Sequence, residues 1–190
     1  MVERVSALNG HYRTGRLGDA GTCGVTLLEN KNLSLIQLAA WPDTLNIVSV
    51  KAAQMVGVGQ APGPGRAEIT PNGSLMRIEP LKWWLVGAAE HVLPSVMPAN
   101  QGAVLNLSHS RVWLSISGPQ AALFLNRHLP LDLRGDAFPV GTVASTAFHH
   151  TGVTLWRSEH AFELLVNRGF ALSLWTIMLE SAAQFNAEVI

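Results

Sequence analysis

Residues 105–119, LNLSHSRVWLSISGP, decide the fold. They begin at the end of a predicted strand over residues 103–107, pass through a polar turn, and enter a second predicted strand over residues 111–117. Along the second strand every other residue is apolar, namely Val112, Leu114 and Ile116. This alternation indicates a strand with one buried face. Gly118-Pro119 then opens a helix that carries Ala122, Phe124 and Leu125 toward a core. Two adjacent strands followed by a helix are typical of α+β proteins with mainly antiparallel sheets.

Similar elements are predicted on both sides of this stretch. Strands are predicted at Val25–Leu28, Leu33–Ala40, Ser74–Ile78 and Lys82–Val86, and at residues 142–148, 152–157 and 161–167. Asn30-Lys31-Asn32 predicts a hairpin turn between the first two of these strands. Residues 9–24 and 57–65 are rich in glycine and are predicted to be loops.

Helices are predicted at three further places. Apolar residues at spacings of three and four predict a helix over residues 43–56, with Pro42 near its first turn. A short helix is predicted through His91. The last helix is predicted over residues 169–185, with one apolar face: Phe170, Leu174, Ile177, Ser181 and Phe185.

The order of elements suggests an internal duplication. Two halves, at about residues 1–100 and 101–190, each run strand–strand–helix–strands–helix, although no repeat is visible at the level of residues. No flexible linker separates the halves, so we expect a single α+β domain with two pseudo-repeated halves.

The charge of the chain is low and balanced. Thirteen basic and thirteen acidic side chains cancel, and charged residues make up only 14% of the sequence, against about 25% in average soluble domains. The sequence lacks the basic face of a nucleic-acid binder and the polybasic run of a protein that binds anionic membranes. An obligate protein partner would explain the shortage of charge and the six tryptophans, and so would a biased composition.

The sequence offers little for localisation or covalent chemistry. Cys23 is the only cysteine, so it forms no internal disulfide, thiolate zinc site or iron–sulfur cluster. The first residues lack the apolar stretch of a signal peptide, and no apolar run is long enough for a membrane span. We expect a cytoplasmic protein.

Motifs for cofactors and metals are weak. Gly57-Val58-Gly59-Gln60-Ala61-Pro62 resembles a dinucleotide fingerprint in spacing only, because it follows a helix and ends in proline. His149-His150 invites a metal site, but adjacent side chains of a regular strand point to opposite faces. We expect His128 to be isolated and no metal ligand or cofactor-binding residue in this chain.

Two motifs remain as candidates for an interface or a structural role. Ser108-His109-Ser110-Arg111 contains a serine beside a histidine, but neighbouring side chains on an extended segment diverge, so a polar turn is favoured over a nucleophile and its base. Trp83-Trp84 places one indole on each face of a strand. The outward indole could stack on a pterin or flavin, anchor a protein contact, or be a partly covered surface aromatic.

Four segments of the chain together form a recognisable pattern: residues 105–112 followed by Ile116-Ser117-Gly118-Pro119, then Leu129–Leu133, Phe138–Thr142, and Phe162–Ala171 with Leu174-Trp175. In order and spacing they resemble the sarcosine oxidase gamma subunit family. The first segment is similar to that family's pattern of an acidic residue and Leu-Ser-His-Ser-Arg, a strand, and Ser-Gly-Pro. Asn106 stands where an acidic residue is common, and Gly169 where serine is common. The N-terminal half matches more loosely.

The resemblance implies the fold of the folate-binding domain of glycine-cleavage T-protein, with two interlocked ββαβββα-type halves. It also implies a heterotetramer with alpha, beta and delta subunits that oxidatively demethylates sarcosine. FAD, FMN, NAD, zinc and tetrahydrofolate are implied for those partner subunits, and none for this chain. The expected role is a non-catalytic subunit that packs on the alpha subunit.

Two alternatives stay open at this point. One is a tetrahydrofolate-binding module, for which basic side chains are available but the sequence does not identify the necessary buried carboxylate. The other is the equivalent subunit of an N-methylglutamate-type dehydrogenase complex. Interface or structural roles are expected for seven residues: Trp83, Trp84, Ser108, His109, Arg111, Arg168 and Trp175.

Overall fold

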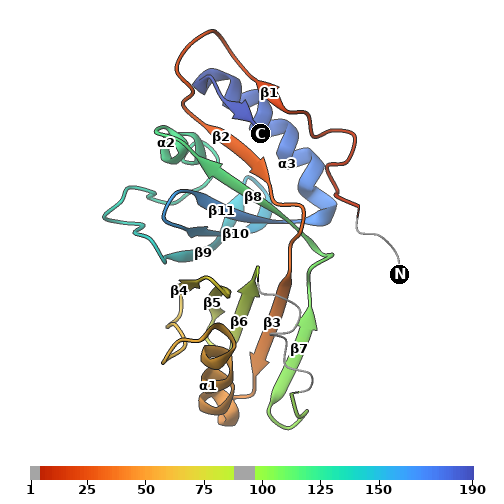
Figure 1. Ribbon diagram of the computed structural model, residues 1–190, viewed down its shortest axis with the longest axis vertical. Coiled ribbons are helices and arrows are strands. Elements are labelled where there is room, and N and C mark those ends of the chain that lie inside the picture. The colour runs from red at the N-terminus through yellow and green to blue at the C-terminus, as the bar shows by residue number, and fades with distance from the viewer. Residues whose placement is uncertain (1–4, 88–96) are drawn as a thin grey trace. The chain divides into compact units, whose positions relative to one another are not determined.

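The computed structural model, which describes residues 5–87 and 97–190, divides the chain into two compact units, each built on one sheet (Figure 1). Unit 1 combines the segment ending at Lys31 with His109–Val140 and Ser145–Ile190. Unit 2 consists of Asn32–Ser108 and Gly141–Ala144. The two units do not coincide with the two halves of the sequence. Unit 1 contains both the first segment of the chain and the C-terminal residues.

Unit 1 holds the larger sheet, called here the large sheet, with strand order β1-β12-β2-β8-β11-β10-β9. Its strands are β1 (Gly15–Arg16), β2 (Thr26–Glu29), β8 (Arg111–Ser117), β9 (Val143–Phe148), β10 (Thr151–Arg157), β11 (Phe162–Asn167) and β12 (Glu188–Val189). Its helices are α2 (Ala121–Leu125) and α3 (Ala171–Ala182), and short 3₁₀ turns at Arg168–Phe170 and Ala183–Phe185 flank α3. The central pairs are antiparallel, whereas β12 and β2 run parallel.

Residues 105–119 are informative about the fold because they include β8, which lies between β2 and β11 in the large sheet. In β8, Leu114 and Ile116 face Leu164 and Leu27 across the neighbouring strands, and all four are buried. The alternation in β8 therefore marks a core face, as predicted. Gly118 follows at a positive φ of 105°, and a Cβ there would lie 2.6 Å from the Gly24 carbonyl oxygen, so only glycine fits.

The buried face of α3 differs from the predicted one. It consists of Ala171, Leu174, Trp175, Met178 and Ala182, followed by Phe185. Phe170, which was predicted on this face, is 54% exposed. Phe170 lies in the 3₁₀ turn Arg168–Phe170, and the regular helix begins only at Ala171. The tighter period of the turn rotates Phe170 away from the buried face.

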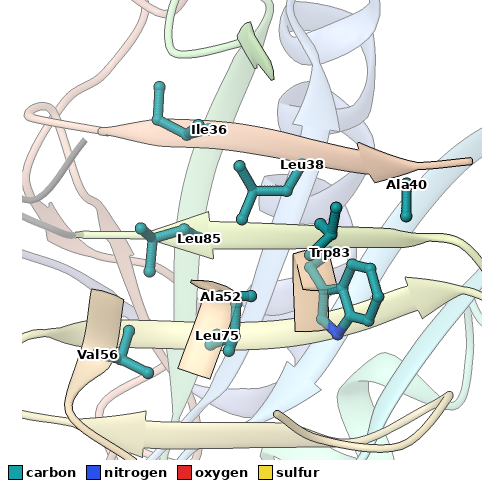
Figure 2. Close-up of a cluster of buried hydrophobic side chains, with 9 residues drawn as sticks. Ile36, Leu38, Ala40, Ala52, Val56, Leu75, Trp83 and Leu85 are labelled. Atoms are coloured by element: carbon teal, nitrogen blue, oxygen red, sulfur yellow. The ribbon is translucent and has the colours of Figure 1, made fainter. Parts of the chain in front are cut away.

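Unit 2 holds the small sheet, with strand order β4-β5-β6-β3-β7 and only antiparallel pairs. Its elements are β3 (Leu35–Ala40), a 3₁₀ turn (Pro42–Thr44), α1 (Leu45–Val56), β4 (Ala67–Thr70), β5 (Gly73–Glu79), β6 (Lys82–Val86) and β7 (Gly102–Asn106). Figure 2 shows the core between α1 and the sheet, where Trp83 and Leu85 of β6 meet Ala52 and Val56 of the helix. Gly57 ends α1 in the left-handed conformation, as helix C-caps commonly do.

The mixed α+β class with two mainly antiparallel sheets confirms the predicted class. The predicted hairpin at Asn30-Lys31-Asn32 is wrong, because β2 belongs to the large sheet and β3 to the small sheet. Strand β4 was not predicted, and neither were the short strands β1 and β12. The predicted helix through His91 lies outside the described residues.

Candidate functional site

The Ser108–Arg111 motif is a turn with its polar groups bonded to the backbone around it. Ser108 Oγ accepts a 2.9 Å hydrogen bond from the Leu35 N–H, and the Ser108 N–H donates to Asn106 Oδ1 at 3.0 Å. The serine hydroxyl thus fastens the end of β7 to the start of β3. His109 is exposed beside it. Residues 108–110 therefore form a polar turn between β7 and β8.

Arginines fasten the same motif in unit 1. Arg111 donates to the carbonyl and the hydroxyl oxygens of Ser110, each at 3.2 Å, and burial lowers the pKa of its guanidinium from the ordinary value. Arg168 donates a 2.7 Å hydrogen bond to the Val5 carbonyl, and its N–H donates to the Ser110 carbonyl at 3.0 Å. Arg168 therefore ties the N-terminal segment to the end of β11.

Neither tryptophan of β6 forms an exposed aromatic platform. Trp83 is fully buried, with the Arg77 guanidinium 4.9 Å from its ring centroid. Trp84, on the opposite face, is also buried and donates from Nε1 to Gln37 Oε1 at 3.0 Å. The indoles alternate between the two faces of the strand as expected, and neither ring is accessible in this chain.

Trp175 is also a core residue. It lies on α3 and stacks on Tyr12, with ring centroids 5.2 Å apart and an angle of 17° between the planes. The Tyr12 hydroxyl donates to the Ile190 carbonyl and accepts from the Glu29 N–H at 3.0 Å. Burial raises the pKa of Tyr12. Tyr12 thereby joins the N-terminal segment, β2, α3 and the C-terminal residue.

A buried carboxylate that sequence reasoning missed lies in the large sheet. Glu163 of β11 accepts hydrogen bonds at Oε2 from Trp113 Nε1, at 2.7 Å, and from the Ser115 hydroxyl. The Ser158 hydroxyl donates to Oε1 at 3.1 Å. Trp156 packs against Trp113, with ring centroids 6.0 Å apart. The signal was a glutamate within the otherwise apolar run Phe162-Glu163-Leu164-Leu165-Val166, where burial requires partners.

A second missed feature is a pair of histidines. His128 Nδ1 lies 3.2 Å from His149 Nε2, although the residues are 21 positions apart. His128 stacks on Phe148 with ring centroids 4.7 Å apart, and the edge of the ring meets Phe124. Burial, then the His149 ring and then the Arg127 guanidinium lower the pKa of His128 to about 4. His128 is therefore not isolated, contrary to the expectation.

The histidine pair borders an open surface pocket of about 380 Å³ lined by residues 126–130, Ala147 and His149. His149 has a φ of 52°, a left-handed conformation that residues other than glycine seldom adopt. With this φ the extended backbone of β9 ends at Phe148, so the alternation of side chains along the strand does not continue to His149. The sequence prediction assumed that His149 and His150 lie on a regular strand and point to opposite faces. In the structure both lie in a turn after β9, and the His149 side chain contacts His128.

Within residues 5–87 and 97–190, no three His, Cys, Asp or Glu side chains converge in a way that could hold a metal ion. In that same part of the chain, no helix combines the length and apolar character needed to cross a membrane.

The chain is an α+β protein whose two mainly antiparallel sheets form the fold seen in a glycine-cleavage aminomethyltransferase. The fold matches the aminomethyltransferase T of Bartonella henselae with a TM-score of 0.63 at 19% identity, over 88% of this chain and 48% of that protein. Within that class, the chain belongs to the sarcosine oxidase, gamma subunit family, whose model matches residues 73–184.

Individual relatives agree with this assignment. The chain is similar to a sarcosine oxidase subunit gamma of Corynebacterium sp. (strain U-96), with 29% identity over 176 residues, covering 88% of this chain and 84% of the relative. It is also similar to a chain of the heterotetrameric sarcosine oxidase from Corynebacterium sp. U-96, solved in complex with pyrrole 2-carboxylate. That match has a TM-score of 0.77 and 26% identity, and it covers 90% of this chain and 89% of the other.

Proposed function

We propose that this chain is the non-catalytic gamma subunit of a heterotetrameric, flavin-dependent sarcosine oxidase of the cytoplasm. The observation that carries the proposal is the match to a chain of a heterotetrameric sarcosine oxidase over about nine-tenths of both chains, at a TM-score of 0.77. A likeness over nearly the whole of both chains supports an equivalent place in an assembly, with alpha, beta and delta subunits as partners.

The local chemistry of the chain supports a structural role. The Ser108 hydroxyl is bonded to the backbone of Leu35, and its neighbour His109 is exposed. The three tryptophans that were candidates for a contact surface, Trp83, Trp84 and Trp175, are buried in the core. On this proposal FAD, FMN, NAD, zinc and tetrahydrofolate belong to the partner subunits, and this chain packs on the alpha subunit.

A tetrahydrofolate-binding module is the second candidate, and one observation bears on it. A pterin site needs a carboxylate with free acceptor positions and an accessible aromatic face. Glu163 beside Trp113 and Trp156 supplies the residue types, but three donors already occupy the carboxylate, and Trp156 is 1% exposed. This geometry favours a structural polar cluster over a pterin site. Calorimetric titration of the isolated chain with tetrahydrofolate tests the candidate, and saturable micromolar binding would support it.

The substrate of the complex is tested by reconstitution. The chain is co-expressed with alpha, beta and delta subunits from the same organism, and the purified assembly is assayed with sarcosine and with N-methylglutamate. We expect turnover of sarcosine. Preferential turnover of N-methylglutamate would assign the chain to the related dehydrogenase complex instead.

A further inference from the structure

The contact between His128 and His149 is built by elements far apart in the sequence. His128 follows α2, and His149 lies in the turn between β9 and β10. Phe148 supports the His128 ring from one face at a centroid distance of 4.7 Å and an angle of 10°. The His149 N–H also donates to the His128 carbonyl at 3.5 Å. The two imidazoles are therefore held together by packing as well as by their own contact.

Backbone conformation adds a second, independent observation. His149 has one of two positive φ values found among the described non-glycine residues, and a left-handed φ has an energetic cost for a residue with a Cβ. A glycine would adopt this turn without that cost. The turn therefore holds His149 in a left-handed conformation with its Nε2 3.2 Å from His128 Nδ1, beside a surface pocket.

The spacing of the two nitrogens suits chelation. Zinc–imidazole bonds are about 2.0–2.1 Å long, so two adjacent nitrogens on one ion lie about 2.8–3.4 Å apart for bond angles between a right angle and the tetrahedral value. The observed separation between His128 Nδ1 and His149 Nε2 is 3.2 Å. The two nitrogens are within hydrogen-bond distance of each other. His149 is exposed, so its side chain has room to rotate and to present Nε2 to an ion beside His128 Nδ1.

We propose that His128 and His149 form a two-histidine site for a divalent late first-row transition-metal ion, with solvent at the remaining coordination positions. Neutral imidazole is a good ligand for Zn²⁺, Ni²⁺ and Cu²⁺. Because the described residues supply no third ionisable ligand, the site has open positions and modest affinity. This site lies in unit 1 and does not depend on the proposed assembly.

The test uses the full chain, purified without a polyhistidine tag and stripped with EDTA. Zn²⁺ and Ni²⁺ are titrated separately by calorimetry. We expect one ion per chain, and His149→Gly is expected to weaken binding at least about tenfold, equivalent to about 1.4 kcal/mol. His128→Asn should have the same effect. Glycine suits the φ of residue 149, so loss of binding in His149→Gly cannot be assigned to an unfavourable turn.

Two matched controls keep the result specific. His150→Ala removes the adjacent histidine, and His160→Ala removes one whose side chain is 93% exposed; both should bind the ions as the parent chain does. Circular dichroism establishes that each variant is folded. The proposal is overturned if the parent chain shows no saturable uptake of either ion, or if His149→Gly binds as tightly as the parent.

Discussion

The indole Nε1 of Trp113 donates a 2.7 Å hydrogen bond to the buried carboxylate of Glu163 on the neighbouring strand of the large sheet. The register places Ser115 directly opposite Glu163, so Trp113 is its diagonal neighbour two residues along β8. Cross-strand pairs of this kind hold antiparallel sheets in register. Asn30 extends the cluster by donating to the Ser115 hydroxyl at 2.7 Å, which links β2, β8 and β11 through polar groups inside unit 1.

Replacing Glu163 tests the cluster. Glu163→Ala leaves the indole N–H and two hydroxyls without their common acceptor, and we expect a loss of about 3 kcal/mol in the free energy of unfolding. Glu163→Gln keeps one acceptor oxygen and should lose about 1–2 kcal/mol. Urea denaturation measures both. Glu159→Gln, at a side chain that is 78% exposed, is the control and should stay within about 0.5 kcal/mol. Equal stabilities for the Glu159 and Glu163 variants would contradict the structural role.

Trp83 is expected to be a core residue and not a contact residue. Trp83→Ala should cost about 3–5 kcal/mol, because it removes the largest side chain of the cluster in Figure 2. Trp83→Phe should cost less, because the aromatic body remains. Trp41 is 47% exposed, so Trp41→Phe is the matched control with an expected change below about 1 kcal/mol. If Trp83→Phe proved harmless to stability but weakened subunit assembly, Trp83 would be a contact residue after all.

The hydroxyl of Ser108 is expected to matter for stability and not for chemistry. Ser108→Ala leaves the Leu35 N–H without its acceptor and should cost about 1 kcal/mol in the free energy of unfolding. Ser173→Ala, at an exposed position of α3, is the comparison. In the assembled oxidase, His109→Ala should leave sarcosine turnover per flavin unchanged. A large fall in kcat for His109→Ala would show that the motif takes part in catalysis.

The lowered pKa of His128 predicts that the folded chain loses stability in acid. Its pKa is lowered to about 4 in the folded chain, against about 6.5 when unfolded, so the unfolded state binds the extra proton first. Its contribution is fully present above pH 6.5 and is lost as the pH falls toward 4. Because the ring is only half-buried, solvent screening limits the effect to about 1 kcal/mol.

The measurement is thermal unfolding in EDTA across that pH range. His128→Phe preserves a ring against Phe148 and removes the titrating group, so its stability should depend less on pH between 6.5 and 4. The parent and His150→Ala should show the same steeper dependence. An unchanged slope in His128→Phe would assign the acid sensitivity to other groups.

Local patterns were enough to predict the class and most elements. The alternation of Val112, Leu114 and Ile116 predicted β8, and the spacing of apolar residues predicted α1, because these signals depend only on neighbours in sequence. The register of β8 with β11 and β2 could not be predicted, since it is set by contacts across the sheet. The asparagine-rich turn at residues 30–32 was misinterpreted because turn chemistry does not say which sheet the next strand joins.

The candidate site was less predictable. The run Trp83-Trp84-Leu85-Val86 contains no polar residue, a pattern that is typical of strands buried on both faces. This pattern predicts that both indoles are buried, as the structure shows. The approach of His128 to His149 depends on the stacking with Phe148 and on a left-handed φ at residue 149. Neither is encoded in the spacing of the two histidines, so only the folded structure reveals the pair.

Assembly tests the proposed function most directly. The chain, carrying an affinity tag, is co-expressed with the alpha, beta and delta subunits, and the complex is examined by size-exclusion chromatography with flavin absorbance and subunit stoichiometry as readouts. We predict that the chain elutes with the flavoprotein subunits in equal amounts and that the complex oxidises sarcosine. A chain that elutes alone as a well-folded monomer, while the other subunits assemble and turn over sarcosine at full rate without it, would contradict the account.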